Sequence, residues 1–254
     1  MARAAVSGRL TGRLAWRVGH LRLVRDESPS ARTLVFEVPG WPGHLAGQHV
    51  DVRLTAEDGY STERSYSIGS ASSGDVVELT VQRVPDGEVS PYLVDVLKVG
   101  DPVELRGPVG GWFVWRPADS APVLLLAGGS GAVPLMAMIR ARASAAVRVP
   151  FRLIYSARTP EDVLYADELR RRALQDRGLD VTYVYTRRGP DGHGRPPGRL
   201  TAADLAEWGW PPDFEPSCFV CGPTGFVEAA ADLLVDAGHE ARRIKTERFG
   251  PTGG

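Results

Sequence analysis

The sequence contains few cysteines, which limits the metal and redox chemistry that its own side chains can perform. Cys218 and Cys221 are the only two in 254 residues, too few for an iron–sulfur cluster held by a full set of thiolates. Their C-x-x-C spacing also occurs in disulfide and zinc sites. It lies in the apolar run 217–221, typical of a β-strand, where residues three apart point to opposite faces. The five histidines are scattered, so we expect neither a disulfide nor a metal site.

The chain also lacks a net charge and a long apolar segment. Its 30 Lys and Arg nearly balance 31 Asp and Glu, a formal net charge of -1, so no overall basic field favours nucleic acid or an acidic membrane surface. No stretch approaches the roughly 18 apolar residues that span a bilayer. Residues 1–13 have no apolar core of signal-peptide length. We expect a cytoplasmic protein with no nucleic-acid or membrane partner.

The first half of the chain has the pattern of a short-stranded antiparallel domain. Alternating or β-branched runs are separated by Gly, Pro, Asp and Ser clusters, which predicts an antiparallel barrel or sandwich. The predicted strands cover residues 16–25, 32–38, 49–54, 64–68, 76–84 and 102–106. One helix interrupts them, with Ser90 as N-cap, Pro91 at its first position and residues 92–97 following. The polar, Pro-bounded segment 116–122 predicts domains at 14–117 and 118–254.

The second half alternates strand, loop and helix. Buried strands are predicted at residues 123–127, 151–155, 179–185 and 218–221, with a more polar one at 243–249. Helices are predicted at residues 134–145, 160–175, 202–208 and 224–237. This alternation indicates a five-stranded parallel sheet covered by helices on both faces. Ligands of such sheets bind beyond the carboxyl ends of the strands.

A glycine-rich turn gives the strongest local signal of the second half. The strand at 123–127 runs into Gly128, Gly129, Ser130 and Gly131, and a helix opened by Pro134 follows. Free backbone amides and the positive helix end suit a dinucleotide pyrophosphate. An ordinary tight turn is the alternative. No lysine follows the turn, which argues against a nucleotide-hydrolysing P-loop.

Two segments of the first half carry phosphate- and ring-binding residue types. Arg64-Ser65-Tyr66-Ser67 lies at a strand end, and Gly87-Glu88-Val89-Ser90 leads into the helix. Arginine offers a fork of donors for phosphate, tyrosine a flat surface for a ring, and the helix start free amides. A surface arginine and a packed strand tyrosine are the alternative.

The order of these segments resembles the ferredoxin-NADP reductase superfamily over residues 16–249, nearly the whole chain. The matching motifs are residues 64–67, 87–90, 107–113, the turn at Gly128, Cys221-Gly222-Pro223 and Glu247-Arg248-Phe249. The resemblance implies an antiparallel β-barrel flavin domain followed by an α/β nicotinamide-binding domain. It also implies that FAD and a nicotinamide dinucleotide meet between them.

The resemblance further assigns roles to individual residues. Arg64, Gly87 and Ser90 would contact the flavin pyrophosphate, Tyr66 the isoalloxazine or ribityl chain, and Ser67 flavin N5. The resemblance names Ser67, Cys221 and Glu247 as the residues that shape catalysis. The remaining cofactor-binding candidates are Ser65, Val81, Val89, the turn residues 128–131 with Pro134, and Gly222, Pro223 and Phe249.

Two of these assignments have structural alternatives. Cys221 matches a cysteine bordering the nicotinamide, or is a small buried hydrophobe. Phe249 matches an aromatic that covers the flavin, but the plant-type pattern ends on tyrosine and this chain continues through residues 250–254. A core phenylalanine is therefore the alternative for Phe249.

The function implied is a monomeric NAD(P)H-dependent flavin oxidoreductase that passes electrons to a separate acceptor protein such as a ferredoxin, flavodoxin, oxygenase or haem protein. A noncatalytic regulatory subunit and a free-flavin reductase are the alternatives. Arg158, Arg187 and Arg199 follow successive elements of the second half and match arginines that hold a 2'-phosphate. This favours NADPH, with NADH left open.

Overall fold

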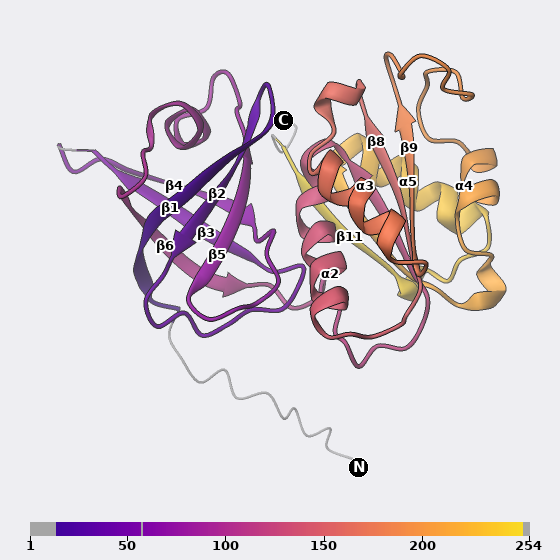
Figure 1. Cartoon of the computed structure of the whole chain (residues 1–254), viewed down its shortest axis with the longest axis horizontal. Coiled ribbons are helices and arrows are strands. Elements are labelled where there is room, and N and C mark those ends of the chain that lie inside the picture. The colour runs from indigo at the N-terminus through magenta and orange to yellow at the C-terminus, as the bar shows by residue number, and fades with distance from the viewer. Residues whose placement is uncertain (1–13, 57, 251–254) are drawn as a thin grey trace, which may run out of the picture.

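The computed structural model describes residues 14–56 and 58–250 and has two lobes (Figure 1). The first lobe is a six-stranded antiparallel sheet in the order β4-β3-β6-β1-β2-β5. An isolated bridge between Ile68 and Leu79 links its two edges, which closes the predicted barrel. The strands are β1 (Trp16–Ser28), β2 (Ala31–Glu37), β3 (His49–Thr55), β4 (Ser61–Ser67), β5 (Val76–Gln82) and β6 (Pro102–Val109).

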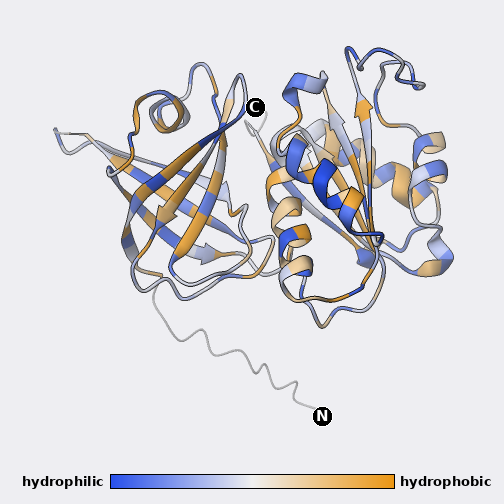
Figure 2. Cartoon of the chain, in the orientation of Figure 1, coloured by the Kyte–Doolittle hydropathy of each residue, from blue (hydrophilic) through white to orange (hydrophobic). Residues whose placement is uncertain are grey.

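The barrel forms because its strands alternate apolar and polar residues, as Figure 2 shows along several of them. The inward residues build one core that includes Leu21, Phe36, Val50, Leu79 and Leu105, each with no exposed surface. The predicted helix covers this core only as a short turn, α1 (Val89–Pro91), followed by a π-helical turn, η1 (Tyr92–Val96).

The predicted N-cap of that helix is wrong. Ser90 lies inside the first turn, and Glu88 precedes it as the capping residue without a side-chain cap bond. The Ser90 hydroxyl instead accepts a hydrogen bond from the backbone N–H of Val84 at 3.0 Å. The hydroxyl therefore stabilises the loop before the helix and not the helix end.

The second lobe confirms the predicted five-stranded parallel sheet, in the order β11-β10-β7-β8-β9. Its strands are β7 (Val123–Gly128), β8 (Phe151–Ala157), β9 (Leu179–Tyr185), β10 (Ser217–Pro223) and β11 (Ile244–Phe249). Its α-helices are α2 (Ala132–Ser144), α3 (Ala166–Gln175), α4 (Ala202–Trp208) and α5 (Thr224–Asp236). Single helical turns occur at Gly129–Gly131, Pro160–Asp162, Pro212–Phe214 and Ala241–Arg243. The strand order reverses between β7 and β10, where sheets of this kind bind ligands.

The predicted helix at residues 160–175 is wrong in its first third. Thr159 donates from its N–H and its hydroxyl to Asp162, and this closes a single 3-10 turn. The chain then leaves helical geometry, and Tyr165 adopts a left-handed conformation with φ 58°. The α-helix begins only at Ala166. Contacts from the barrel to Tyr165, described below, account for this break.

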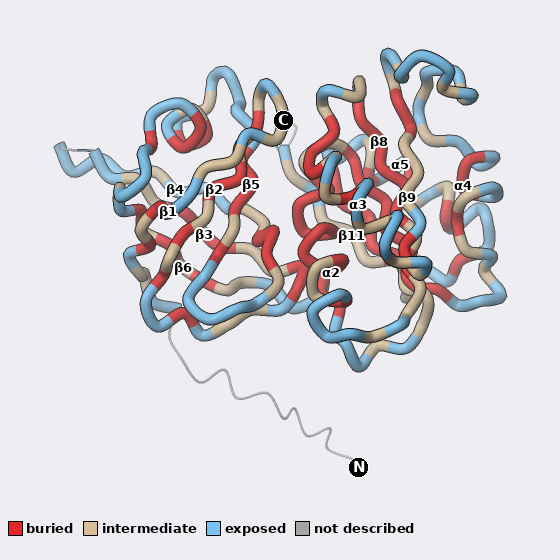
Figure 3. The backbone as a smooth tube through the Cα atoms, viewed as in Figure 1, coloured by how far each residue is buried: buried red, intermediate tan, exposed pale blue. Residues whose placement is uncertain are grey.

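Helix α2 lies between the barrel and the parallel sheet (Figure 1). All residues from 132 to 139 are buried, because one side of the helix packs on the sheet and the other on the barrel lobe. One core cluster accordingly joins α2 to Ala31, Ala46, Phe113 and Trp115 from the first half. Figure 3 shows buried backbone continuing across this contact. In the described part of the chain, no helix is long and apolar enough to cross a membrane.

Candidate functional site

Three sequence-predicted residues from both lobes come together around His49. Cys221 and Glu247 are register partners on the neighbouring parallel strands β10 and β11. Ser67 and His49 are register partners on the antiparallel strands β4 and β3. The Nδ1 atom of His49 lies 3.8 Å from Oε1 of Glu247. This contact connects the end of the flavin-side strand with the end of the nicotinamide-side strands.

The sequence does not predict His49 as a site residue, because its five histidines are considered only as scattered candidates for a metal site. His44 has a separate structural role: its Nδ1 accepts from Trp41 Nε1 at 3.0 Å, and its Nε2 lies 3.0 Å from the carbonyl oxygen of Ser70. His49 opens β3 opposite Ser67, but the approach of Glu247 depends on how the two lobes pack. Among the described residues no cluster of His, Cys, Asp and Glu could hold a metal ion.

Burial dominates the electrostatics of this site. It raises the pKa of Glu247 to about 7, and Glu247 Oε2 is buried without a hydrogen-bond partner in the described chain. Burial lowers the pKa of His49 and, together with the charge of Glu247, raises that of Cys221 well above its ordinary value. Cys221 is therefore an uncharged thiol, not a nucleophilic thiolate. A buried carboxylate oxygen without a partner indicates that a ligand group completes the site.

The raised pKa of Glu247 predicts a pH-dependent stability. The unfolded chain ionises this group near its ordinary value of 4.5 and the folded protein near 7. The wild type therefore loses up to about 3 kcal/mol as the pH rises from about 4.5 to about 7. Glu247→Gln removes that loss, so the free energy of unfolding of the variant should rise relative to that of the wild type as the pH rises. Urea unfolding of both proteins at about pH 5 and pH 8 measures this difference. Glu228→Gln, at an exposed position in α5, is the control. An equal stability difference at both pH values would contradict the assignment.

The predicted flavin-binding residues of β4 lie on both faces of the strand. Alternation places Tyr66, Arg64 and Thr62 on one face and Ser65 and Ser67 on the other. The Ser65 hydroxyl donates to Asp51 at 2.7 Å. Tyr66 packs against the barrel core, and burial raises its pKa to about 12. Arg64 is exposed and forms no ion pair with any residue in the described ranges. Its guanidinium is therefore available to an anionic ligand.

A cavity lies beside Thr62 of this row. It has a volume of about 660 Å³ and is bordered by Tyr60, Thr62, Glu88 and Tyr92. The hydroxyl of Tyr60 lies 3.4 Å from the Glu88 carboxylate, which connects the β3–β4 turn with the start of α1. A ligand lying along Tyr66 and Arg64 would have room here for a further ring system. Such room fits the adenosine half of FAD.

The other flavin-side candidates are buried or tightly packed. The side chains of Val81 and Val89 are buried in the barrel core, with 0% and 1% exposure. Gly87 lies directly beside Ser90, because a β-carbon on it would come within 3.1 Å of the Ser90 hydroxyl. The hydroxyl of Ser90 is taken by Val84. The backbone N–H of Gly87 donates to the carbonyl oxygen of Val84 at 3.0 Å.

The glycine-rich turn is shaped first by packing. A β-carbon on Gly131 would lie 2.0 Å from the carbonyl oxygen of Cys221, and one on Gly128 would lie 2.6 Å from the ring of Phe226. A β-carbon on Gly222 would lie 3.1 Å from the Cα atom of Gly128. The turn therefore lies directly against the end of β10, at the reversal of strand order. Ser130 is partly exposed there, and Pro134 is buried within α2.

Three exposed arginines lie at the far side of the parallel sheet from Cys221. The backbone N–H groups of Arg187 and Arg188 donate to the carbonyl oxygen of Arg158 at 3.0 and 3.2 Å, so the ends of β8 and β9 are fixed together. The carbonyl oxygen of Arg199 accepts from Arg195. Arg188 pairs with Glu161 at 2.8 Å. In the described ranges, Arg158, Arg187 and Arg199 have no acidic partner.

Phe249 is the last residue of β11 and lies opposite Pro223. Its ring is partly buried and packs against the core cluster of the second lobe. This contact agrees with the core alternative, and it leaves part of the ring exposed beside the site. The role of Phe249 over a flavin stays a prediction.

Two family descriptions match the chain, one for each lobe. The oxidoreductase FAD-binding domain matches residues 20–114, and the oxidoreductase NAD-binding domain matches residues 125–232. The chain therefore belongs to the ferredoxin-NADP reductase superfamily of oxidoreductases that bind FAD and a nicotinamide dinucleotide. The resemblance seen in the order of the motifs is confirmed.

Individual relatives extend this finding. The glycine betaine monooxygenase reductase subunit of Pseudomonas aeruginosa (strain UCBPP-PA14) is 36% identical over 210 residues, which are 81% of this chain and 56% of the relative. The chain thus spans about half the length of that curated relative. The flavohem-like FAD/NAD binding domain of nitric oxide dioxygenase from Vibrio cholerae O1 biovar El Tor matches with a TM-score of 0.83 and 27% identity, over 92% of this chain and 99% of that one. A cytochrome P450 reductase from Amycolatopsis matches with a TM-score of 0.84 and 28% identity, over 98% and 74%.

Proposed function

We propose that this protein oxidises NADPH at bound FAD and passes the electrons to a separate acceptor protein. The meeting of Ser67, Cys221 and Glu247 around His49 carries this proposal. Residues of the FAD-binding and nicotinamide-binding lobes there face one site, as hydride transfer between the two cofactors requires. Relatives named as a monooxygenase reductase subunit and a cytochrome P450 reductase support an oxygenase or haem protein as the acceptor.

The residues present fit FAD. Arg64 would hold the pyrophosphate together with backbone amides of the Gly87–Ser90 loop, and Tyr66 would lie along the ring system. The cavity bordered by Tyr60 and Tyr92 would take the adenosine. When bound, FAD supplies the redox chemistry, because a flavin accepts a hydride and releases electrons singly.

The protein's own groups orient and tune the site. Glu247, with a pKa of about 7, changes protonation near neutral pH and lies beside a histidine that burial keeps neutral. Cys221 keeps an uncharged, fully buried thiol at the end of β10, where it would border the nicotinamide from below the surface. Ser67 offers a hydroxyl on the barrel side. Together these groups fix position and limit water, which is the main contribution of protein to hydride transfer.

The arginines near the ends of β8 and β9 support NADPH over NADH. Arg158 and Arg187 follow neighbouring strands, at the place where the adenosine ribose of a dinucleotide is expected. Both lack an acidic partner among the described residues, unlike Arg188. We propose that they contact the 2'-phosphate, with Arg199 as a third contact.

Anaerobic titration of the purified protein tests the proposed function. We expect a yellow protein that releases FAD, identified by mass, and that NADPH bleaches. A flavin that NADPH does not reduce would favour the noncatalytic alternative. FMN alone at full occupancy would contradict the assignment of the cavity, and rapid loss of flavin during purification would favour a free-flavin reductase.

Cys221→Ala is expected to slow flavin reduction about tenfold or more while FAD stays bound, because the thiol borders the nicotinamide and not the flavin. Stopped-flow reduction with NADPH measures this. Cys218→Ala is the matched control, because Cys218 is equally buried on the same strand but lies near His239, away from the site. Equal reduction rates in the wild type and both variants would return Cys221 to a packing role.

A further inference from the structure

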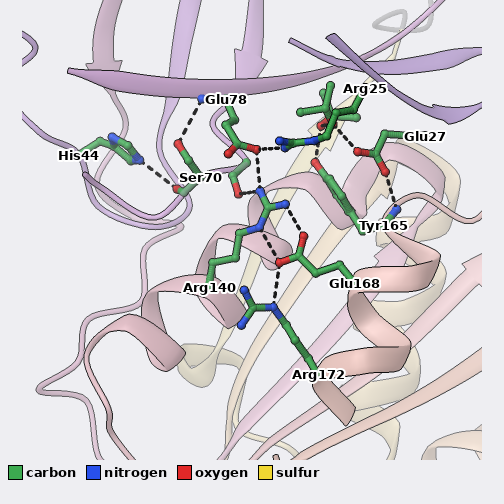
Figure 4. A network of polar contacts seen from close by, with 12 residues as sticks. Arg25, Glu27, His44, Ser70, Glu78, Arg140, Tyr165, Glu168 and Arg172 are labelled. Carbon is green, nitrogen blue, oxygen red and sulfur yellow. Dashed lines mark hydrogen bonds and ion pairs between the residues drawn. The ribbon is translucent and has the colours of Figure 1, made fainter. Parts of the chain in front are cut away.

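A polar network at the contact between the lobes centres on Arg140 of α2 (Figure 4). Nη1 of Arg140 donates to the carbonyl oxygen of Gly69 at 2.8 Å and to Glu78 at 3.2 Å, both in the barrel lobe. Its Nε donates to Glu168 of α3 at 3.1 Å, and its Nη2 forms a second bond to the same carboxylate. Only 11% of the Arg140 side chain is exposed. One guanidinium thus binds a carboxylate from each lobe.

Further arginines complete a chain of alternating charge. Arg25 of β1 pairs with Glu78, and Arg172 pairs with Glu168 at 2.8 Å. Glu78 therefore pairs with Arg25, Glu168 pairs with Arg172, and both carboxylates also pair with Arg140. Bonds to Arg140 and then Arg172 lower the pKa of Glu168 against the effect of its burial. A charged network of this kind stays stable only while its geometry is kept.

Tyr165 makes a second connection between the lobes. Its left-handed backbone directs its N–H toward the barrel, where it donates to Glu27 at 3.0 Å. Its hydroxyl donates to Thr80 of β5. Arg140 lies over the ring of Tyr165, with its guanidinium carbon 5.1 Å from the ring centre. A bulky residue persists in this conformation only where its surroundings require it, so docking on the barrel explains the break before α3.

Both ends of this network lead into the candidate active site. Gly69, which accepts from Arg140, follows Ser67 by two residues. Helix α2, which carries Arg140, starts directly after the glycine turn that lies against Cys221. The side chain of Arg140 thus ties the flavin-side strand to the helix beyond the nicotinamide-side turn. A small displacement here would change the separation of the two cofactors.

We propose that Arg140, supported by Tyr165, is a positioning residue that locks the two lobes in the arrangement needed for hydride transfer. This inference rests on the proposed function for its kinetic consequence.

Arg140→Met and Arg142→Met form a matched pair that tests the lock. Both remove an arginine from α2 whose side chain is at most 11% exposed. Arg142, however, forms an ion pair with Asp176 and donates to the carbonyl oxygen of Val149, both within the second lobe. In Arg140→Met, Glu78 and Glu168 each keep one arginine partner, so the variant should fold. We expect Arg140→Met to retain FAD and bind NADPH within about threefold of wild type, yet to reduce the flavin about tenfold more slowly or worse. Arg142→Met should lose thermal stability but reduce at the wild-type rate, and Arg140→Lys should recover part of the rate.

Amide hydrogen exchange gives a readout that does not depend on turnover. The N–H of Tyr165 donates across the lobes to Glu27, whereas the neighbouring N–H of Leu164 donates to Tyr155 within its own lobe. In Arg140→Met we expect exchange at Tyr165 to rise about tenfold or more, and exchange at Leu164 to change much less. Unchanged exchange at Tyr165, or an equal loss of reduction rate in Arg140→Met and Arg142→Met, would overturn the lock. If the wild type reduced no flavin, the proposed function would fail while the exchange experiment still decided the docking.

Discussion

Gly131→Ala is expected to slow flavin reduction by NADPH about 100-fold and to weaken nucleotide binding, while FAD stays bound. A β-carbon at this position would lie 2.0 Å from the carbonyl oxygen of Cys221 and 2.8 Å from the backbone nitrogen of Gly222. Neither backbone atom can rotate away, so the turn or the end of β10 must move. A displacement of about 1 Å at a reacting pair can cost about 100-fold in rate.

Gly225→Ala is the control for this experiment. Gly225 lies in the first turn of α5, and a β-carbon on it would have no heavy atom within 4 Å. Alanine there should leave reduction unchanged and add up to about 1 kcal/mol of stability through helix propensity. Stopped-flow reduction and nucleotide titration of both variants measure the contrast. Wild-type kinetics in Gly131→Ala would show that the turn does not position the nicotinamide.

The architecture could be predicted from the sequence because its signals are local. Alternating residues indicate the barrel strands, and strand–helix repeats indicate the parallel sheet. The order of Arg64–Ser67, the glycine turn and Cys221–Pro223 then identified the family. Each of these signals depends on residues close together in the chain, and the structure agrees with them. The sequence predicts strands that hold Cys221 and Glu247, and the structure adds that these two strands are neighbours.

The features that the sequence does not predict depend on which partner each residue meets in the folded chain. Tyr165 breaks the predicted helix because Glu27, 138 residues away, accepts its N–H. Ser90 has the residue type of an N-cap, but its hydroxyl accepts a hydrogen bond from the N–H of Val84. His49 gains its partner Glu247 only when the two lobes pack together. A sequence pattern gives each residue's local preference, and tertiary contacts decide among the possible partners.

The glycine turn shows a subtler limit. Its sequence favours phosphate binding through free amides, and the structure gives a packing reason for two of its glycines and for Gly222 beside it. Gly128, Gly131 and Gly222 all face neighbours that leave no room for a β-carbon. Gly129 differs, because it has φ 54° and open space around it. A glycine-rich pattern therefore does not separate close packing from ligand approach.

NADPH is expected to be used at least tenfold more efficiently than NADH, and Arg158→Ala should remove most of that preference. A charge-assisted contact to a phosphate contributes about 1.5 to 3 kcal/mol, equivalent to roughly 10- to 150-fold in affinity. Arg158 is exposed, and its backbone carbonyl binds the N–H groups of both Arg187 and Arg188. Its side chain therefore extends from a fixed point beside Arg187, so two arginines can converge on one phosphate.

Arg188→Ala provides the matched control, because Glu161 already neutralises this arginine at 2.8 Å. Hydrogen bonding in the turn that begins at Thr159, together with the bond from Arg188, lowers the pKa of Glu161 to about 2, so its carboxylate stays charged throughout the neutral range. Losing Arg188 should then change the ratio of NADPH to NADH efficiency much less than losing Arg158. Steady-state kinetics with both nucleotides measure these ratios for the wild type and the two variants. A wild type that uses both nucleotides equally, or an unchanged ratio in Arg158→Ala, would show that the arginines do not read the 2'-phosphate.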